Sequence, residues 1–157
     1  MTKKKIYLIE ENLQKNYNKY YKVAFSYVHN HNDTMDIVQE SAYKAIKNAN
    51  TLKNIKYLDT WIYRIVINQC KTFLLKNKYE NEDIENVNIS FNDKYENIDL
   101  KNALNTLDED EKAIIILRFF EDLKLEDISN ILDVNINTLK SRLYRCLKKL
   151  ENIIKEV

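Results

Sequence analysis

The sequence predicts an all-α protein with two small helical domains, an acidic flexible linker between them and a helix-turn-helix in the C-terminal domain. The chain has 157 residues and contains neither Gly nor Pro, so a fold rich in tight hairpins would be difficult to build. Apolar residues recur at three- and four-residue spacing in several separate stretches, which is typical of amphipathic helices. Residues 79–97 break this pattern, and a loop of that length is unusual inside one compact domain.

The break divides the chain into residues 1–78, the linker 79–97 and residues 98–157. Charge is distributed unevenly, since residues 80–111 contain 11 acids and two lysines, whereas residues 140–157 contain six basic residues and two acids. Charge segregation of this kind indicates a basic end that binds nucleic acid and an acidic middle with another role.

The cysteines and the apolar runs indicate the compartment. Cys70 and Cys146 lie far apart in helical patterns and imply no disulfide framework, which suits a reducing cytoplasm. No apolar run approaches the roughly 20 residues of a membrane span, and the basic start of the chain is not followed by the apolar core of a signal peptide. We therefore expect a cytoplasmic protein with no direct membrane insertion.

Three helices are expected in the N-terminal part of the chain. The first, from about Tyr7 to Asn30, carries tyrosines at helical spacing that we interpret as a packing face. The second runs from about Thr34 to Asn48, and either Asn32 or Asp33 in the preceding turn can cap it. 

A metal site formed by His29 and His31 with Asp36 or Glu40 is one interpretation of the turn before the second helix. The spacing of these residues matches no defined metal site. We therefore expect no metal ion and no cofactor.

The third helix, from about Tyr57 to Lys78, mixes aromatic and basic side chains. Residues 56–78 contain five basic residues and one acid. Basic groups interleaved with aromatic rings suit single-stranded nucleic acid, because bases stack on the rings and cations hold the backbone. The alternative is that Trp61 and the neighbouring apolar residues simply form a core stripe.

The C-terminal part is expected to begin with a helix over residues 100–107. Asp108 and Glu111 then have the spacing of a capping box that uses Asp. The helix that follows contains AIIILRFF, which is apolar enough to be the central buried element of this domain. A turn at Asp122–Lys124 leads into the last two helices.

A short helix, a tight turn and a long helix are predicted between Leu125 and Leu150. Only residues 133–135 separate the two helices, which matches a helix-turn-helix unit. The long helix has an apolar stripe on one side and on the other a basic, hydrogen-bonding face made of Lys140, Ser141, Arg142, Tyr144, Arg145, Lys148 and Lys149. This face suits the major groove of DNA, where Lys and Arg meet phosphates and Arg, Ser and Thr read base edges. A charged face that is merely solvated is the alternative.

Taken in order, these motifs resemble a bacterial RNA polymerase sigma factor of the extracytoplasmic-function (ECF) group. DIVQES at 36–41 is similar to a helix of conserved region 2, and TWIYRIVINQCKTFL at 60–74 is similar to the helix that follows it. The segments ALNTLDEDEKAIIILRFF, LEDISNIL and NTLKSRLYRCLKKL, within residues 103–150, are similar to region 4. Such a protein would bind core RNA polymerase and confer promoter recognition.

The resemblance implies three sets of site residues and assigns the N-terminal domain to the polymerase and the minus-10 element. Core polymerase would be bound by Asp36, Gln39 and Glu40. The melted minus-10 element would be read by the loop 55–59 with Trp61, Tyr63, Arg64, Asn68 and Lys71. The duplex minus-35 element would be bound by Thr138, Lys140, Ser141, Arg142, Tyr144, Arg145 and Lys148. The linker would extend toward the active-site channel of the polymerase, and the resemblance implies an anti-sigma factor as a further partner.

The chain departs from the family pattern in its turns. The family often has Gly where this chain has Asp122, Asp133 and Asn137, but Asp and Asn tolerate a left-handed backbone better than other non-Gly residues. The helix that begins at Leu125 also lacks a Ser or Thr cap, because Lys124 precedes it.

Two other functions compete with this interpretation. A self-sufficient helix-turn-helix regulator that binds duplex DNA would account for residues 125–150 but leaves the basic, aromatic third helix without a role. A metal-dependent nuclease using His29, His31 and Glu40 is supported neither by paired carboxylates at metal-site spacing nor by a phosphate loop. We therefore predict no enzyme and no small-molecule substrate.

Overall fold

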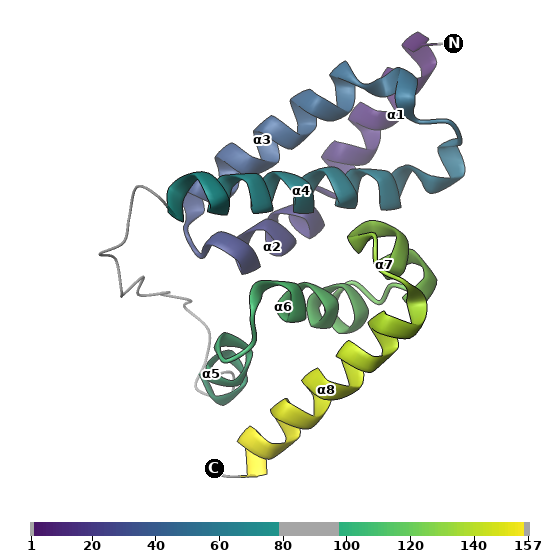
Figure 1. Ribbon diagram of the computed structural model, residues 1–157. Helices are drawn as coiled ribbons and strands as arrows, with labels where there is room; N and C mark the ends of the chain where they lie inside the picture. Colours follow the sequence, from purple (N-terminus) through teal and green to yellow (C-terminus); the bar gives the residue numbers. More distant parts are fainter. Residues whose placement is uncertain (1, 79–97, 156–157) are drawn as a thin grey trace.

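The computed structural model describes residues 2–78 and 98–155, and every regular element in these residues is helical. The N-terminal part contains four α-helices, α1 (Thr2–Lys15), α2 (Tyr17–Val28), α3 (His31–Lys47) and α4 (Leu58–Lys78). Two 3-10 turns, η1 (Ala49–Thr51) and η2 (Ile55–Tyr57), connect α3 to α4 (Figure 1).

The C-terminal part contains the remaining helices in the order that the sequence predicts. They are α5 (Ile98–Asn105), α6 (Glu109–Ile115), the short π-helix η4 (Ile116–Phe120), α7 (Leu125–Leu132) and α8 (Ile136–Lys155). The predicted all-α class with a C-terminal helix-turn-helix is confirmed, with α7 and α8 as its two helices. The predicted linker at 79–97 lies outside the described residues.

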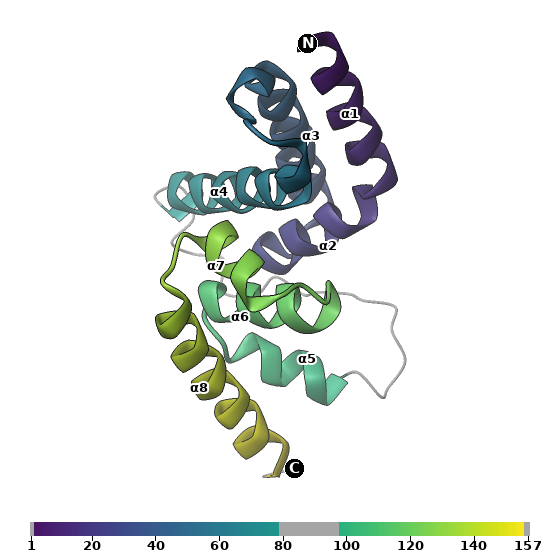
Figure 2. The same cartoon turned by 90° about the vertical axis from the view of Figure 1, so that its right-hand side faces the viewer.

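The two parts lie against each other. α2 and α4 of the N-terminal part face α6 and α7 of the C-terminal part, while α8 packs on α5, α6 and α7 (Figures 1 and 2). Buried side chains of both parts form one apolar cluster that runs from Ile9 in α1 to Leu150 in α8. This arrangement holds α4 between its own bundle and the helix-turn-helix.

The single first helix expected from about Tyr7 to Asn30 is wrong, because the chain forms two helices that break at Asn16. Asn16 leaves helical geometry with φ −107° and ψ 17°. The bend allows the Tyr20 hydroxyl in α2 to donate to the Asn12 side-chain oxygen in α1 at 2.5 Å. Tyr20 is then buried, as the predicted packing face requires.

The helix expected from about Thr34 begins earlier, at His31, and its cap is neither Asn32 nor Asp33. Asn30 is the capping residue, and its side-chain oxygen accepts from the backbone N–H of Asp33 at 2.9 Å. Asn at this position satisfies one of the free N–H groups of the first turn.

The segment AIIILRFF is only partly the buried element that its composition predicts. Ala113, Ile114 and Leu117 are buried, but the side chains of Phe119 and Phe120 are 55% and 58% exposed. Leu117 of the short π-helix η4 still faces the core, whereas the two phenylalanines lie at the C-terminal end of η4, where the helix ends.

Two of the three Asp and Asn residues that stand where the family often has Gly adopt a left-handed backbone. Asp122 and Asp133 both have φ 54°, whereas Asn137 lies inside α8 with ordinary helical geometry. Lys124 precedes α7 without any side-chain capping bond, which confirms the predicted weak start of that helix. His29, which ends α2, is a further left-handed residue that was not anticipated.

Candidate nucleic-acid interfaces

Helix α8 has one buried stripe and one exposed face. Leu139, Leu143, Cys146 and Leu150 are buried at spacings of three and four residues. The predicted DNA-binding residues lie on the rest of the helix, where most are exposed and Arg142 is partly buried: Thr138, Lys140, Ser141, Arg142, Tyr144, Arg145 and Lys148. The side-chain oxygen of Asn135 accepts from the backbone N–H of Asn137 at 2.8 Å and so caps the start of α8.

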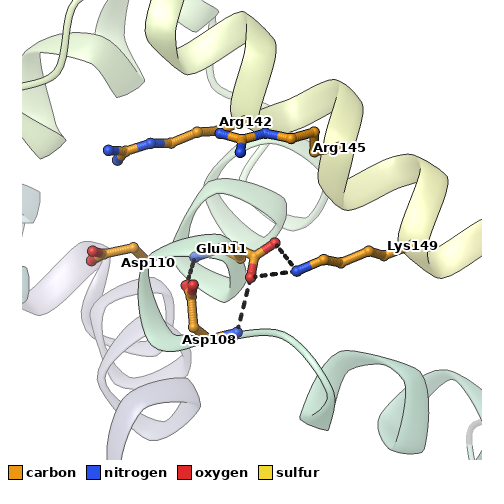
Figure 3. Close-up of a pocket in the computed structure, with 6 residues that line it drawn as sticks. All are labelled: Asp108, Asp110, Glu111, Arg142, Arg145 and Lys149. Atoms are coloured by element: carbon orange, nitrogen blue, oxygen red, sulfur yellow. Dashed lines mark hydrogen bonds and ion pairs between the residues drawn. The ribbon is translucent and has the colours of Figure 1, made fainter.

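Glu111 attaches α8 to the start of α6. Its carboxylate accepts from Lys149 Nζ at 3.1 and 3.2 Å and from Cys146 Sγ at 3.2 Å. It also completes the predicted capping box with Asp108, which is present in full. Figure 3 shows this carboxylate between the cap of α6 and the lysine of α8.

A cavity of about 300 Å³ lies beside this contact. It is lined by the first turn of α6 and by basic residues of α8: Asp108, Asp110, Glu111, Arg142, Arg145 and Lys149. In Figure 3 the side chains of Arg142 and Arg145 extend on the α8 side, apart from the hydrogen-bonded Lys149. Lys149 therefore holds the helix in place, while the two arginines are free of the Glu111 contact.

Glu111 should make the helix-turn-helix sensitive to acid. Burial alone would raise the pKa of its carboxyl, but the hydrogen bonds from Cys146, Lys149 and Asp108 outweigh burial and lower the pKa to about 2. A carboxyl with a lowered pKa in the folded state contributes stability above its unfolded pKa of about 4.5. That contribution is lost as the pH falls from about 4.5 toward 2.

We expect Glu111→Gln to lower the free energy of unfolding at pH 7 by about 1–3 kcal/mol, because the charged hydrogen bonds are lost. The variant should also lose less stability than the unmodified chain between pH 4.5 and pH 2. Urea unfolding followed by circular dichroism at several pH values measures both effects. Glu11→Gln, at an exposed position in α1, is the matched control, and an equal loss in both variants would contradict the role of Glu111.

Helix α4 carries the residues predicted to read a melted minus-10 element. Asn68 and Arg64 are exposed, Lys71 is partly exposed, and Trp61 is partly buried. Tyr63 is different, because its side chain is 4% exposed and its ring packs edge-on against Tyr20 at 5.0 Å between centroids. In this arrangement Tyr63 belongs to the core, and only the other four are accessible.

A cavity of about 450 Å³ opens next to Trp61. Tyr57 of the predicted reading loop, Trp61 and Arg64 line it from the N-terminal part, and Asn130 of α7 lines it from the C-terminal part. An aromatic ring and a guanidinium beside a cavity are groups on which a nucleic-acid base can stack.

The residues predicted to bind polymerase lie on one face of α3. Asp36, Gln39 and Glu40 are exposed, and spacings of three and four residues place them on neighbouring turns of one side. Ile37, Val38 and Ser41, on the other side, are buried. The short motif therefore presents a polar patch on a helix that its apolar residues anchor.

His29 lies at the contact between the two parts. Its Nε2 is 3.2 Å from Lys112 Nζ, and burial together with the lysine charge lowers its pKa to about 4. A neutral ring beside a cation is a structural contact. Among residues 2–78 and 98–155, no group of three or more His, Cys, Asp or Glu side chains is placed to hold a metal ion.

Sequence reasoning missed the acids that meet α4 from the C-terminal part. Asp110 Oδ1 lies 3.4 Å from Lys71 Nζ, and Asp133 Oδ2 lies 3.8 Å from Arg64 Nη2. Glu121 Oε2 accepts from the Tyr63 hydroxyl at 3.1 Å. No spacing in the sequence signals these pairs, because the partners lie in separate elements.

The fold and the exposed basic face of α8 are those of a nucleic-acid-binding protein. An all-α chain whose helix-turn-helix has an exposed basic face on its second helix is typical of DNA-binding proteins. In the described part of the chain, no helix has both the length and the apolar character that crossing a membrane requires.

Comparison with known proteins gives the family. The model of sigma-70 region 2 matches residues 13–79, and that of sigma-70 region 4 matches residues 98–150. The chain is 46% identical to the RNA polymerase sigma factor SigV of Bacillus subtilis, over 82% of this chain and 80% of that protein. It is 33% identical to the ECF RNA polymerase sigma-E factor of Haemophilus influenzae, over 78% of this chain and 75% of that protein.

A solved structure agrees with these relatives. The sigma factor RpoE from Bartonella quintana, in complex with the anti-sigma factor NepR, has a TM-score of 0.73 and 26% identity over 93% of this chain and 96% of that chain. The chain belongs to the sigma-70 family, as an RNA polymerase sigma factor of the ECF group. The predicted family is confirmed, and a self-sufficient helix-turn-helix regulator is not favoured.

Proposed function

We propose that this sigma factor reads the two elements of its promoters with α4 and α8. The presence of two basic helices on separate parts of one chain supports this division, because a promoter with two elements needs two reading surfaces. Residues 1–78 bind core polymerase and the minus-10 element, and residues 98–157 bind the minus-35 element. Residues 79–97 connect the two.

In this proposal each element has its own chemistry. The exposed face of α8 enters the major groove of the duplex minus-35 element, with Arg142 and Arg145 as the residues best suited to bidentate contact with guanine. The melted minus-10 strand stacks on Trp61 and is held by Arg64 and Lys71 along α4. Asp36, Gln39 and Glu40 of α3 contact core polymerase.

The proposal also covers what the chain does not do and where it acts. It works in the cytoplasm as a binding protein, without catalytic activity, cofactor or small-molecule substrate. Since the Bartonella relative forms a complex with an anti-sigma factor, we include an anti-sigma protein among the partners of this chain.

Run-off transcription tests the function directly. Bacterial core polymerase is incubated with a library of promoter fragments, with and without this protein. Start sites that appear only with the protein, preceded by two common sequence elements, are the expected result. Retention of duplex DNA by the protein alone, without any transcript, would instead favour an independent regulator.

Polymerase binding should depend on the exposed face of α3. Glu40→Lys reverses one charge on this face and is expected to weaken binding to core polymerase by about tenfold, as for a charge pair at an interface. The fold should be unchanged, because Glu40 is exposed. Binding is measured by competition with a labelled wild-type chain, and Glu10→Lys on α1 is the control. If both variants bind polymerase with equal affinity, Glu40 does not contribute to the interface and the proposed role of α3 is contradicted.

A further inference from the structure

We propose that helix α1 positions the segment that reads the melted minus-10 strand. This segment, residues 52–59, joins α3 to α4 and is here called the connector segment. Two side chains of α1, Lys5 and Asn12, hold it at its two ends. The inference rests on the proposed role of α4 and its preceding loop at the minus-10 element. It gives a function to a helix that carries none of the assigned contact residues.

The connector segment is anchored to α1 at its first and last residues. The Lys5 ammonium donates to the backbone oxygen of Leu52 at 2.7 Å, and the side-chain NH₂ of Asn12 donates to Asp59 Oδ1. The Leu52 side chain is also buried. Between the anchors, residues 53–57 are all exposed, and their only regular structure is the short turn η2.

The two anchors share one register. Lys5 and Asn12 are seven residues apart on α1, so they lie on one side of the helix with their Cα atoms about 10 Å apart. Leu52 and Asp59 are also seven residues apart, and both contacts span 47 residues. The connector lies at the same end of the N-terminal part as the first turns of α1, and η1 packs on α1 (Figure 1). A rigid helix therefore holds two points of a segment that has little regular structure of its own.

Asn12 is itself held by the core. Its side-chain oxygen accepts from the Tyr20 hydroxyl at 2.5 Å, and Tyr20 is 1% exposed. Because the oxygen is used by the tyrosine, the NH₂ group of Asn12 is the group that faces Asp59. The helix break at Asn16 brings Tyr20 to Asn12. The bend between α1 and α2 thus fixes the orientation of Asn12 and, through it, the position of Asp59.

The anchored ends adjoin the cavity beside Trp61. Leu52 lines the cavity at one anchor, and Thr60, the residue after Asp59, lines it at the other. Tyr57, in the middle of the connector segment, also lines it and is 52% exposed. Groups that must be ordered when a ligand binds weaken the binding. Because α1 holds the segment before the strand arrives, less ordering remains for the step in which a base is bound.

Exchanging two side chains tests the anchor at Asn12. Asn12→Asp places a second carboxylate against Asp59, so this contact should break, while the new carboxylate still accepts from Tyr20. Asn12→Asp combined with Asp59→Asn restores both hydrogen bonds, with donor and acceptor exchanged between the two positions. Asp59→Asn alone measures any separate role of Asp59.

Lys5→Met and Lys5→Arg test the other anchor. Met keeps the length of the side chain but cannot donate to the backbone oxygen of Leu52, whereas Arg keeps a donor. Lys4→Met removes the same charge from the exposed neighbouring position and is the matched control. Circular dichroism first shows which variants are folded, and the Lys5 pair decides the test if Asn12→Asp does not fold.

Two readouts separate positioning from general stability. Hydrogen exchange of the full chain reports the connector directly through the amides of Leu52, Lys56 and Tyr57, which form hydrogen bonds within it. The second readout uses polymerase holoenzyme on a promoter fragment that run-off transcription has selected. It measures initial promoter binding and the rate of open-complex formation separately.

Asn12→Asp and Lys5→Met should each speed exchange at these amides and slow open-complex formation by about 2- to 12-fold. This range corresponds to one side chain that must be ordered during binding. Initial binding should change by less than about twofold, because the duplex minus-35 element contributes to it through α8. The exchanged pair and Lys5→Arg should recover most of the wild-type rate, and Lys4→Met should behave as wild type.

Three results would overturn the proposal. If exchange speeds up in the variants but open complexes form at the wild-type rate, the position of the segment does not affect strand binding. If exchange is unchanged in both Asn12→Asp and Lys5→Met, α1 does not hold the segment. If the exchanged pair stays as slow as Asn12→Asp while Asp59→Asn alone is normal, the defect does not come from this contact.

The proposed function fails separately. Absence of any transcript with the wild-type chain would contradict the assignment of promoter reading to this protein. Hydrogen exchange would still show whether α1 holds the connector segment, because it is measured on the chain without polymerase or DNA.

Discussion

Arg145→Ala is expected to reduce binding of the polymerase holoenzyme to its promoter by about 5- to 150-fold. The Arg145 side chain is exposed on α8 and carries no salt bridge among those described. A bidentate contact to a guanine in the major groove contributes about 1–3 kcal/mol of discrimination, which gives this range. The measurement is a titration of promoter DNA with holoenzyme, followed by run-off transcription.

Two controls are needed, one that changes the promoter sequence and one that changes a different residue of the protein. On a fragment whose minus-35 element has been scrambled, wild type and Arg145→Ala should bind equally weakly, because the lost contact no longer exists. Lys3→Ala removes one positive charge from an exposed position in α1 and should have little effect on either fragment. A loss of the same size on both fragments would mean that Arg145 contacts the backbone or polymerase instead of a base.

Leu139→Ala should lower the free energy of unfolding by about 2–5 kcal/mol, which is the largest loss of stability expected among the variants described here. Leu139 is fully buried in the first turns of α8, which packs on α5, α6 and α7. Removing its side chain leaves a cavity at the centre of the helix-turn-helix. Because α8 carries the minus-35 surface, the same variant should also lose minus-35-dependent transcription as the temperature is raised.

Leu75→Ala is a control with identical chemistry. The Leu75 side chain is 62% exposed on α4, so its removal should change the free energy of unfolding by no more than about 0.5 kcal/mol. Urea unfolding followed by circular dichroism compares the two variants. Similar losses in both would show that α8 does not pack around Leu139 as the structure places it.

The helices could be predicted largely because their signals are local. Apolar spacing located α4, α7 and α8 to within a few residues, and the capping box of Asp108 and Glu111 is a four-residue pattern that the structure reproduces. The left-handed turns at Asp122 and Asp133 follow from the tolerance of Asp for that backbone. The exposed basic face of α8 follows from the same periodicity.

Other features could not be predicted because they have no local signature. Nothing at Asn16 resembles a helix breaker such as Gly or Pro, yet the packing of α2 on α3 and α4 is achieved with a bend there. Phe119 and Phe120 look like core residues in sequence, but they lie at the end of η4 and are exposed. Tyr63 is an aromatic residue next to a basic one and was therefore predicted to contact nucleic acid, but the helical bundle buries it against Tyr20.

The fold class, the order of the helices, the basic face of α8 and the family follow from the sequence alone, because each depends on residues that are close together in the chain. The contact of Glu111 with Lys149 and the ion pairs of Arg64 and Lys71 with Asp133 and Asp110 depend on how the helices pack against one another. The Tyr63–Glu121 bond spans 58 residues and the His29–Lys112 contact spans 83. Such pairs form because two surfaces pack, and the shape of those surfaces is settled only when all the helices are in place.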